Sequence, residues 1–221
     1  EDERIRIFIS DMSFVSFTET IIDSSMMKEY GGKGTYTIPI EHVCKVLSIP
    51  SGKSEVSFGF TEDKMFFEIQ ETFEGGKERS IDFDIFLVDS ETQELEIPEI
   101  DFDFQFVEKF SVLKKLFNDF CFVSDHVKLK TESHSNSMIL SCKGDIGSAS
   151  MQVNIDSKQS SDDVDLDFSL RFINTFLKCQ ITPDVNVCLK QDFPLCFVFN
   201  MPGSSYMRCF LAPRMDGGDE D

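Results

Sequence analysis

Residues 168–211 read FSLRFINTFLKCQITPDVNVCLKQDFPLCFVFNMPGSSYMRCFL, and this stretch predicts the fold. We expect a helix from Phe168 to Lys178, because its apolar side chains recur every three or four residues and form one stripe. Three short strands should follow it, at Val185 to Lys190, Leu195 to Asn200 and Tyr206 to Leu211. A helix followed by antiparallel strands indicates an α+β fold with helices on one face of the sheets.

The same series occurs earlier in the chain. A helix is predicted from Ile38 to Leu47, with Pro39 at an early helical position, and strands follow at Glu55 to Phe60, Lys64 to Gln70 and Arg79 to Val88. A strand pair precedes each helix. The pairs are Arg4 to Ile9 with Val15 to Ile22, and His126 to Thr131 with Met138 to Ser141, extended by Ser148 to Ile155. The chain therefore contains two similar domains.

The second copy has one piece more, a strand from Phe102 to Phe106 and a helix from Val107 to Phe117. We expect the corresponding leading strand and helix of the first copy to be absent from this sequence. The predicted organisation is an N-terminal domain over residues 1–88, an acidic connector over 89–101, a C-terminal domain over 102–213 and an acidic tail over 214–221.

The amino-acid composition limits the classes of function to consider. The 221 residues carry a net charge of −19, which on average disfavours nucleic-acid binding unless the basic residues gather on one face. No apolar run approaches a membrane span and the first residues do not resemble a signal peptide, so we expect a soluble protein that does not bind membranes. The 24 phenylalanines often alternate with acids, which is typical of half-buried strands.

Signatures of catalysis and metal binding are scarce. Seven scattered cysteines contain no C-x-x-C pair and are expected to be reduced and mostly buried. Gly52-Lys53-Ser54 lacks the earlier glycine of a phosphate loop, and the three histidines match no ligand pattern. An acidic cluster at residues 162–167 is interpreted as a solvated loop whose last acid caps the following helix. We therefore expect no enzyme, metal or cofactor.

Basic residues gather on the predicted helices. Lys109, Lys114 and Lys115 belong to the helix from Val107 to Phe117. Arg171 and Lys178 stand seven residues apart and so share a face of the last helix, opposite its apolar stripe. Lys45 takes a similar place on the first helix. Three such helices in an acidic chain predict a locally positive surface.

Five segments carry a resemblance to a known family, and they are Asp11-Met12-Ser13-Phe14-Val15-Ser16-Phe17, Leu95-Glu96-Ile97-Pro98-Glu99, Leu170 to Lys178, Asp192-Phe193-Pro194-Leu195 and Phe210-Leu211-Ala212-Pro213-Arg214. Through them the sequence resembles, over essentially the whole chain, the proliferating cell nuclear antigen family of DNA sliding clamps. The connector and the Leu-Ala-Pro-Arg ending, in this order, are the specific marks. Phe14, Phe17, Phe193 and Phe210 replace smaller or more polar family residues, so this looks like a divergent member.

The resemblance implies a nuclear, homotrimeric ring that encircles duplex DNA without reading its sequence. The helices would line the hole, with Lys45, Lys109, Lys114, Lys115, Arg171 and Lys178 facing DNA. Ring closure would pair an edge near Ser80 to Leu87 with one near Ser148 to Ile155 of the next subunit. Implied partners are DNA polymerase, the clamp loader, flap endonuclease, DNA ligase and other proteins with a clamp-binding motif, in replication and repair.

The resemblance also implies an apolar groove under the connector, into which partners insert one aliphatic and two aromatic anchors. The residues that line it by position are Val15, Phe17, Leu95, Ile97, Pro98, Phe102, Phe193, Pro194, Phe210, Ala212 and Pro213. Two alternatives stay open: a subunit of a heterotrimeric checkpoint clamp, and an acidic enzyme or protein-interaction module without a role on DNA.

Overall fold

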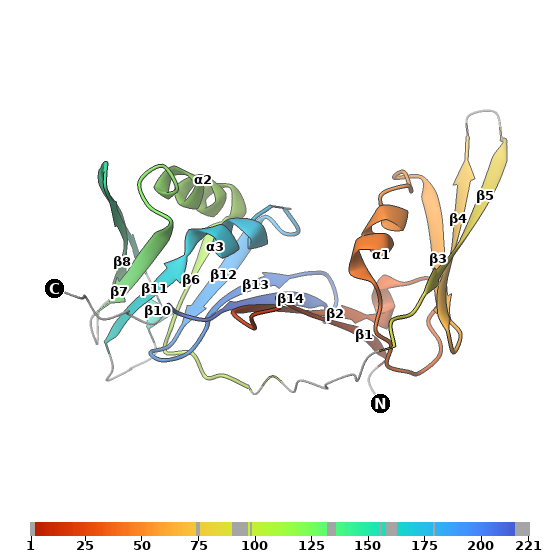
Figure 1. Ribbon diagram of the computed structural model, residues 1–221, viewed down its shortest axis with the longest axis horizontal. Coiled ribbons are helices and arrows are strands. Elements are labelled where there is room, and N and C mark those ends of the chain that lie inside the picture. The colour runs from red at the N-terminus through yellow and green to blue at the C-terminus, as the bar shows by residue number, and fades with distance from the viewer. Residues whose placement is uncertain are drawn as a thin grey trace. The chain divides into compact units, whose positions relative to one another are not determined.

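The computed structural model describes residues 3–73, 76–89, 97, 99–131, 136–154, 156–157, 163–178 and 180–214. The chain divides into two compact units (Figure 1). Unit 1 contains residues 1–30 and 99–221, and unit 2 contains residues 31–98. Antiparallel sheets and three helices confirm the predicted α+β class.

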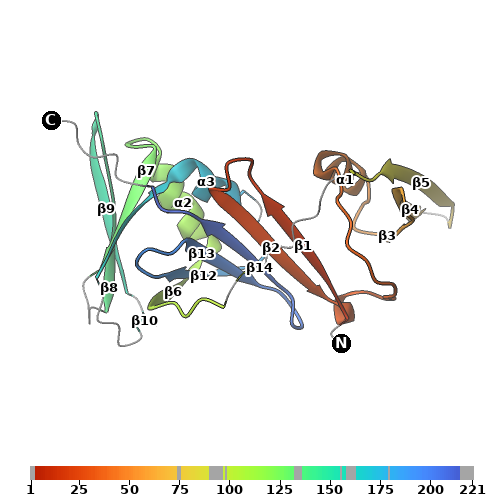
Figure 2. The same ribbon diagram turned by 60° about the horizontal axis from the view of Figure 1, so that its bottom comes forward.

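Unit 1 contains a seven-stranded sheet in the order β1-β2-β14-β13-β12-β6-β10. Its strands are β1 (Arg4–Ser10), β2 (Ser16–Asp23), β6 (Phe104–Lys109), β10 (Asp156–Ser157), β12 (Asp184–Leu189), β13 (Leu195–Asn200) and β14 (Tyr206–Leu211). A short 3₁₀ turn, η1 (Ser24–Met26), follows β2. Figure 2 shows β1, β2 and β14 side by side, so the two ends of the chain share one sheet.

A second sheet of unit 1 has the order β11-β7-β8-β9. Its strands are β7 (His126–Thr131), β8 (Ser137–Gly144), β9 (Gly147–Asn154) and β11 (Val164–Ser169). Helices α2 (Phe110–Phe120) and α3 (Leu170–Phe176) lie over the sheets (Figure 1). One core joins these layers, and buried Phe117, Phe168 and Phe197 contribute large side chains to it. Burial of apolar surface is the main force that holds them together.

Unit 2 is smaller and contains one helix and one sheet of three strands among the described residues. Helix α1 (Ile40–Leu47) lies on the sheet β3-β4-β5, made by β3 (Ser54–Phe60), β4 (Lys64–Thr72) and β5 (Glu78–Phe86). Val43 and Val46 of the helix pack on Phe67 and Ile69 of the central strand. Alternate residues of β4 are buried, as expected for a strand with one face on a core. Among the described residues, no helix is long and apolar enough to cross a membrane.

Several predicted elements were misplaced. The helix predicted from Val107 begins only at Phe110, because Val107 to Lys109 extend β6. The last helix covers Leu170–Phe176, so Phe168 belongs to β11 and Lys178 lies beyond the helix. Pro39 is the N-cap of α1 and not a helical residue. The expected extension from 148 to 155 is a separate strand, β9.

The acidic cluster at residues 162–167 was also misinterpreted. Asp165 and Asp167 lie in β11, opposite Lys130 and Lys128 of β7, and the helix that follows has Ser169 at its N-cap. Alternating acids left Val164, Leu166 and Phe168 on the buried face, so the segment has the period of a strand.

The contacts also group the chain differently from the predicted division at residues 88 and 101. β1 and β2 belong to unit 1, because β2 pairs with β14 along its length. The predicted acidic tail lies outside the described residues after Arg214, and the predicted connector is described only at residue 89, residue 97 and residues 99–101.

Candidate functional site

Helices α2 and α3 bring several predicted DNA-facing residues together. Lys114 of α2 donates a hydrogen bond from Nζ to the backbone oxygen of Lys178 at 3.3 Å, just after α3. Lys115 forms an ion pair with Asp119 one turn later, at 2.5 Å, and Arg171 is exposed on α3. Lys114, Lys115 and Arg171 therefore lie on one pair of neighbouring helices, and Lys178 lies just beyond α3.

Two of the predicted basic residues have a different position from the one expected. Lys109 ends β6 and is the N-cap of α2, so it precedes the helical residues, and its Nζ pairs with the Asp184 carboxylate at 2.6 Å. Lys178 follows α3 and cannot share a helical face with Arg171. Lys45 lies on α1 in unit 2 and pairs with Glu41 at 2.7 Å. These exposed pairs are weak, because solvent screens them.

Several of the predicted groove residues in unit 1 lie at one end of the seven-stranded sheet. Phe17 of β2 lies opposite Phe210 of β14, and their rings stack with centroids 4.6 Å apart. The backbone N–H of Ala212 donates to the oxygen of Val15 at 2.9 Å, which continues the strand pairing beyond β14. Residues nearly 200 positions apart therefore form one surface.

The strand entry at Pro194 joins the same end of the sheet. Leu195 pairs with Leu211, which places Pro194 next to the Ala212–Pro213 ending. Lys190 lies over the Phe193 ring at 5.0 Å and its Nζ donates to the oxygen of Asp101 at 3.3 Å. Lys190 thus links Phe193 to the segment that carries Phe102.

The connector part of the predicted groove is only partly described. Ile97 belongs to unit 2 and is half-buried, whereas Leu95 and Pro98 lie outside the described residues. The eight other groove residues, all in unit 1, are Val15, Phe17, Phe102, Phe193, Pro194, Phe210, Ala212 and Pro213. Of these, Phe210 is buried and Phe193 is exposed.

The turn between β1 and β2 borders this surface. The Asp11 carboxylate accepts hydrogen bonds from the backbone N–H groups of Ser16 and Ser13 at 2.5 and 3.0 Å. The Ser16 bond is the main cause of a lowered pKa of Asp11, because it favours the charged form. The turn holds Phe14 at φ 54°, with two thirds of its surface exposed.

Three residues on the outer face of this sheet were missed by sequence reasoning. Glu19, in the middle of β2, is buried and pairs with Arg6 of β1 and Arg208 of β14. The signal was a glutamate that shares one face of β2 with Phe17 and Ile21. It could not be interpreted, because the pairing of β14 with β2 was not predicted and the predicted pair of β1 with β2 had no assigned register.

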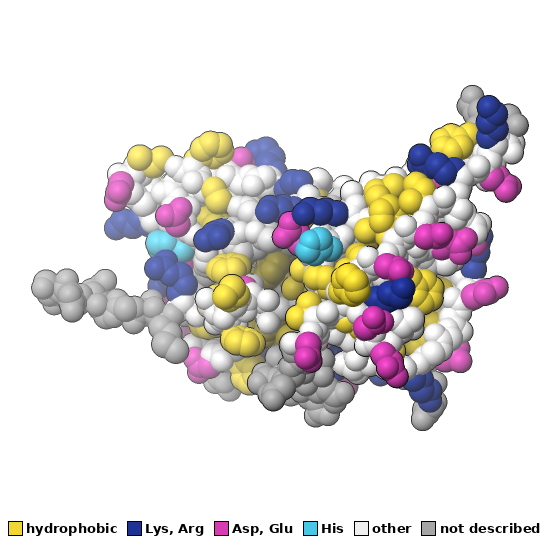
Figure 3. Space-filling view, turned by 45° about the vertical axis from the view of Figure 1, so that its right-hand side comes forward, with side chains coloured by type: hydrophobic (Ala, Val, Ile, Leu, Met, Phe, Trp, Pro, Cys, Tyr) yellow, Lys and Arg dark blue, Asp and Glu magenta, His cyan; other side chains and the backbone are white. Residues whose placement is uncertain are grey.

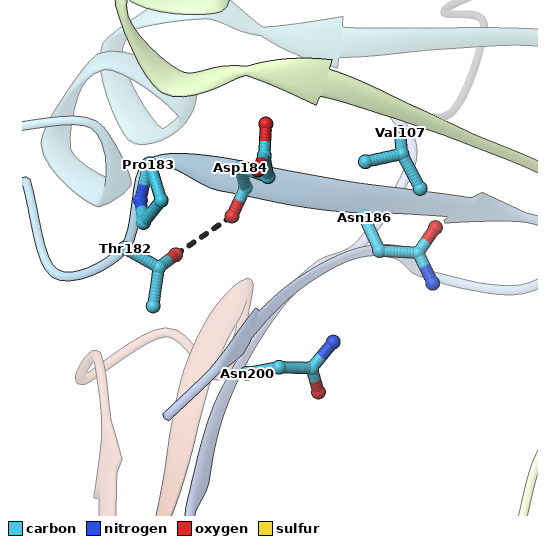
Figure 4. Close-up of a pocket in the computed structure, with 6 residues that line it drawn as sticks. All are labelled: Val107, Thr182, Pro183, Asp184, Asn186 and Asn200. Atoms are coloured by element: carbon cyan, nitrogen blue, oxygen red, sulfur yellow. Dashed lines mark hydrogen bonds between the residues drawn. The ribbon is translucent and has the colours of Figure 1, made fainter. Parts of the chain in front are cut away.

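A shallow pocket lies elsewhere on the same sheet (Figure 4) and has a volume of about 280 Å³. Its lining residues are Val107, Thr182, Pro183, Asp184, Asn186 and Asn200. Asp184 is the one acid among them, and its carboxylate is already paired with Lys109. This lining offers no acid–base pair and no nucleophile next to a base.

Side chains suited to metal binding or catalysis are equally scarce elsewhere among the described residues. No three His, Cys, Asp or Glu side chains lie close enough there to hold a metal ion. Burial raises the pKa of the Cys209 thiol to about 11 and that of Cys196 still further, so both stay protonated near neutral pH. Figure 3 shows acidic side chains spread over the face drawn, with exposed hydrophobic side chains among them.

Comparison with known proteins places these features in a family. Residues 96–214 match the model of the proliferating cell nuclear antigen C-terminal domain. A proliferating cell nuclear antigen from Chaetomium thermophilum is 29% identical over 167 residues, which cover 71% of this chain and 61% of that protein. The chain therefore spans less than two thirds of this relative.

Two further relatives match almost the whole chain. A probable DNA polymerase sliding clamp of Paramecium bursaria Chlorella virus 1 is 28% identical over all of this chain and 83% of its own length. A DNA polymerase sliding clamp of Methanobrevibacter smithii is 26% identical over 99% of this chain and 88% of its own length. The family match confirms the predicted resemblance and agrees with the expectation of a non-enzymatic protein. The chain belongs to the proliferating cell nuclear antigen family.

Proposed function

We propose that three copies of this chain form a ring that encircles duplex DNA and tethers DNA polymerase and repair enzymes to it. Family membership supports the clamp role in general, and the groove residues support the tethering role in particular. The observation that carries the proposal is the convergence of Val15, Phe17, Phe210 and Ala212 on one end of a single sheet.

Ring formation is supported by two open strand edges. Among the described residues, β5 pairs only with β4 and β9 pairs only with β8. The two edges have similar lengths, nine and eight residues. Pairing β5 of one subunit with β9 of the next would satisfy backbone groups that otherwise promote aggregation. Repeating this head-to-tail contact by a rotation that closes gives a ring.

DNA contact is supported by the helices. Lys114, Lys115 and Arg171 lie on two adjacent helices, and Lys178 follows directly. Such residues bind phosphates by charge and carry no sequence information, which permits sliding. Acids over the rest of the surface would repel other DNA. A nuclear location and the individual partners, which include clamp loader, flap endonuclease and DNA ligase, belong to the same proposal.

The tethering role is tested with a synthetic peptide that carries one aliphatic and two aromatic anchors. Calorimetry should detect binding to the wild-type chain, and Phe193→Asp should weaken it at least tenfold, because it puts a charge into the apolar groove. Phe122→Asp is the matched control: it makes the same change at another exposed phenylalanine, 77% accessible, in a turn outside the groove. Equal losses in both variants, or a wild type that does not bind, would contradict the proposal.

A further inference from the structure

A buried carboxylate lies at the junction of the N-terminal hairpin and the C-terminal strand. Glu19 is 3% exposed and stands directly opposite Arg208 of β14 and Phe8 of β1. Its Oε1 accepts a hydrogen bond from Arg6 Nε at 2.8 Å, and its Oε2 accepts one from Arg208 Nε at 3.0 Å. A second nitrogen of Arg208, Nη2, also contacts Oε2. Both carboxylate oxygens are thereby used, as a buried charge requires.

The Arg208 guanidinium also lies over two aromatic rings. Its central carbon is 5.0 Å from the Tyr206 centroid and 5.6 Å from the Phe210 centroid, within the range of cation–π contact. Phe210 stacks on Phe17, and Phe8 extends the row with a centroid 5.8 Å from that of Phe17. An unbroken series of contacts thus leads from Glu19 through Arg208 to the aromatic rings of the candidate groove.

The charge of Arg208 is secure despite its partial burial. Desolvation by itself would lower the pKa of the guanidinium, but the hydrogen bond and the charge of Glu19 outweigh it and raise that pKa. A guanidinium held by two nitrogens on one carboxylate has little freedom to rotate. It therefore presents a fixed cation to the Phe210 ring.

We propose that Glu19 is a positioning residue of the partner-binding groove. It holds Arg208 against Phe210 and so keeps the Phe17–Phe210 stack in the orientation that receives the partner's anchors. The inference rests on the proposed function, because it assigns a role within the same groove. Binding gains when the receiving surface is already ordered, since less freedom is lost on association.

The test compares Glu19→Gln with Arg208→Lys in calorimetric titrations of the full chain with the anchor peptide described above. Glu19→Gln removes the charge that holds Arg208 and should weaken peptide binding about fivefold or more. Arg208→Lys keeps a cation for Glu19 but loses the planar group over Phe210, so it should weaken peptide binding to a similar degree. It should lower the free energy of unfolding in urea by less than Glu19→Gln does. The double variant Glu19→Gln/Arg208→Lys should be less than additive in peptide binding, because both changes break one series of contacts.

Glu71→Gln is the matched control. Among the described residues, Glu71 is the other buried glutamate, 9% exposed, and it pairs with Arg79 across β4 and β5 in unit 2. This variant should lower the free energy of unfolding measured in urea, yet leave the peptide affinity within about twofold of wild type. A purely structural role for Glu19 predicts the same behaviour in Glu19→Gln.

The outcomes separate the two proposals. A wild type that does not bind the peptide overturns the groove itself and this inference with it. A wild type that binds, together with unchanged affinity in Glu19→Gln, overturns only the positioning role. Were Glu19→Gln to unfold, Arg208→Lys decides: unchanged affinity overturns the positioning role, and weaker binding with the fold retained supports it.

Discussion

At the scale of single residues, Phe14 has an unusual backbone conformation. It is one of two non-glycine residues with positive φ in the described part of the chain, and the other is Asp192. A bulky residue in the left-handed region costs energy, and it persists only where its surroundings enforce it. Here the Asp11 carboxylate holds the turn through the N–H groups of Ser13 and Ser16. The strained backbone of Phe14 lies beside the candidate groove, and its side chain faces solvent.

Replacing Phe14 by glycine should therefore stabilise the chain. Relief of the left-handed conformation is worth about 1–2 kcal/mol, and the greater freedom of glycine in the unfolded chain offsets about 0.5–1 kcal/mol of it. We expect a net gain of about 0.5–1 kcal/mol in the free energy of unfolding, measured in urea.

Met12 in the same turn provides the control for that change. It is almost fully exposed and does not have positive φ. Met12→Gly should therefore lower the free energy of unfolding by about 0.5–1 kcal/mol, through the entropy of the unfolded chain alone. A gain in both variants would show that loss of an exposed hydrophobic side chain, and not backbone strain, is responsible.

At the scale of elements, the sequence predicted where strands begin and end better than which strands pair. The bounds of β7, β13 and β14 agree with the sequence, because alternation and turn residues are local signals. The sequence did not indicate that β2 pairs with β14, because strand partners nearly 200 residues apart leave no local trace. β11 was missed because its acids were interpreted as a charged, solvated loop. Their alternation with the buried Val164, Leu166 and Phe168 is the pattern of a strand.

The candidate site was likewise predicted only in part. Val15, Phe17, Phe210 and Ala212 were predicted from family resemblance, and the sheet brings them together. Glu19, Arg6 and Arg208 were not predicted, since their relation depends on the pairing of β14 with β2 and on the register of β1 against β2. Lys109 and Lys178 were assigned to helices whose ends the apolar period does not define to better than a few residues.

Helices α2 and α3 carry the prediction for DNA contact. Lys114→Gln with Arg171→Gln removes two charges from adjacent helices without altering their buried stripes. If both contact phosphates, the slope of log K against log salt concentration should fall by about two, since each contact contributes about 0.9. Fluorescence anisotropy with a duplex at several salt concentrations measures this slope.

Two exposed lysines on strands serve as the control for the helix charges. Lys130 of β7 and Lys143 of β8 carry the same total charge but do not lie on a helix. Lys130→Gln with Lys143→Gln should leave the slope unchanged. Equal slopes for both double variants would mean that DNA responds to net charge alone and not to the helix surface.

At the scale of the whole molecule, a single chain leaves its sheets incomplete. β5 ends the sheet of unit 2 and β9 ends the four-stranded sheet of unit 1, and both present edges of similar length. A net charge of −19 opposes random association, so a specific contact along the strand edges must overcome it. The account therefore depends on self-assembly, because neither the proposed encirclement of DNA nor the proposed sliding is possible for one subunit.

The most direct test is the mass of the purified full chain in solution, measured by light scattering over a range of concentrations at physiological salt. The account predicts a monodisperse particle of three times the 25.2 kDa chain mass. A particle that stays at 25.2 kDa at all concentrations, or one that forms only dimers, would contradict the ring.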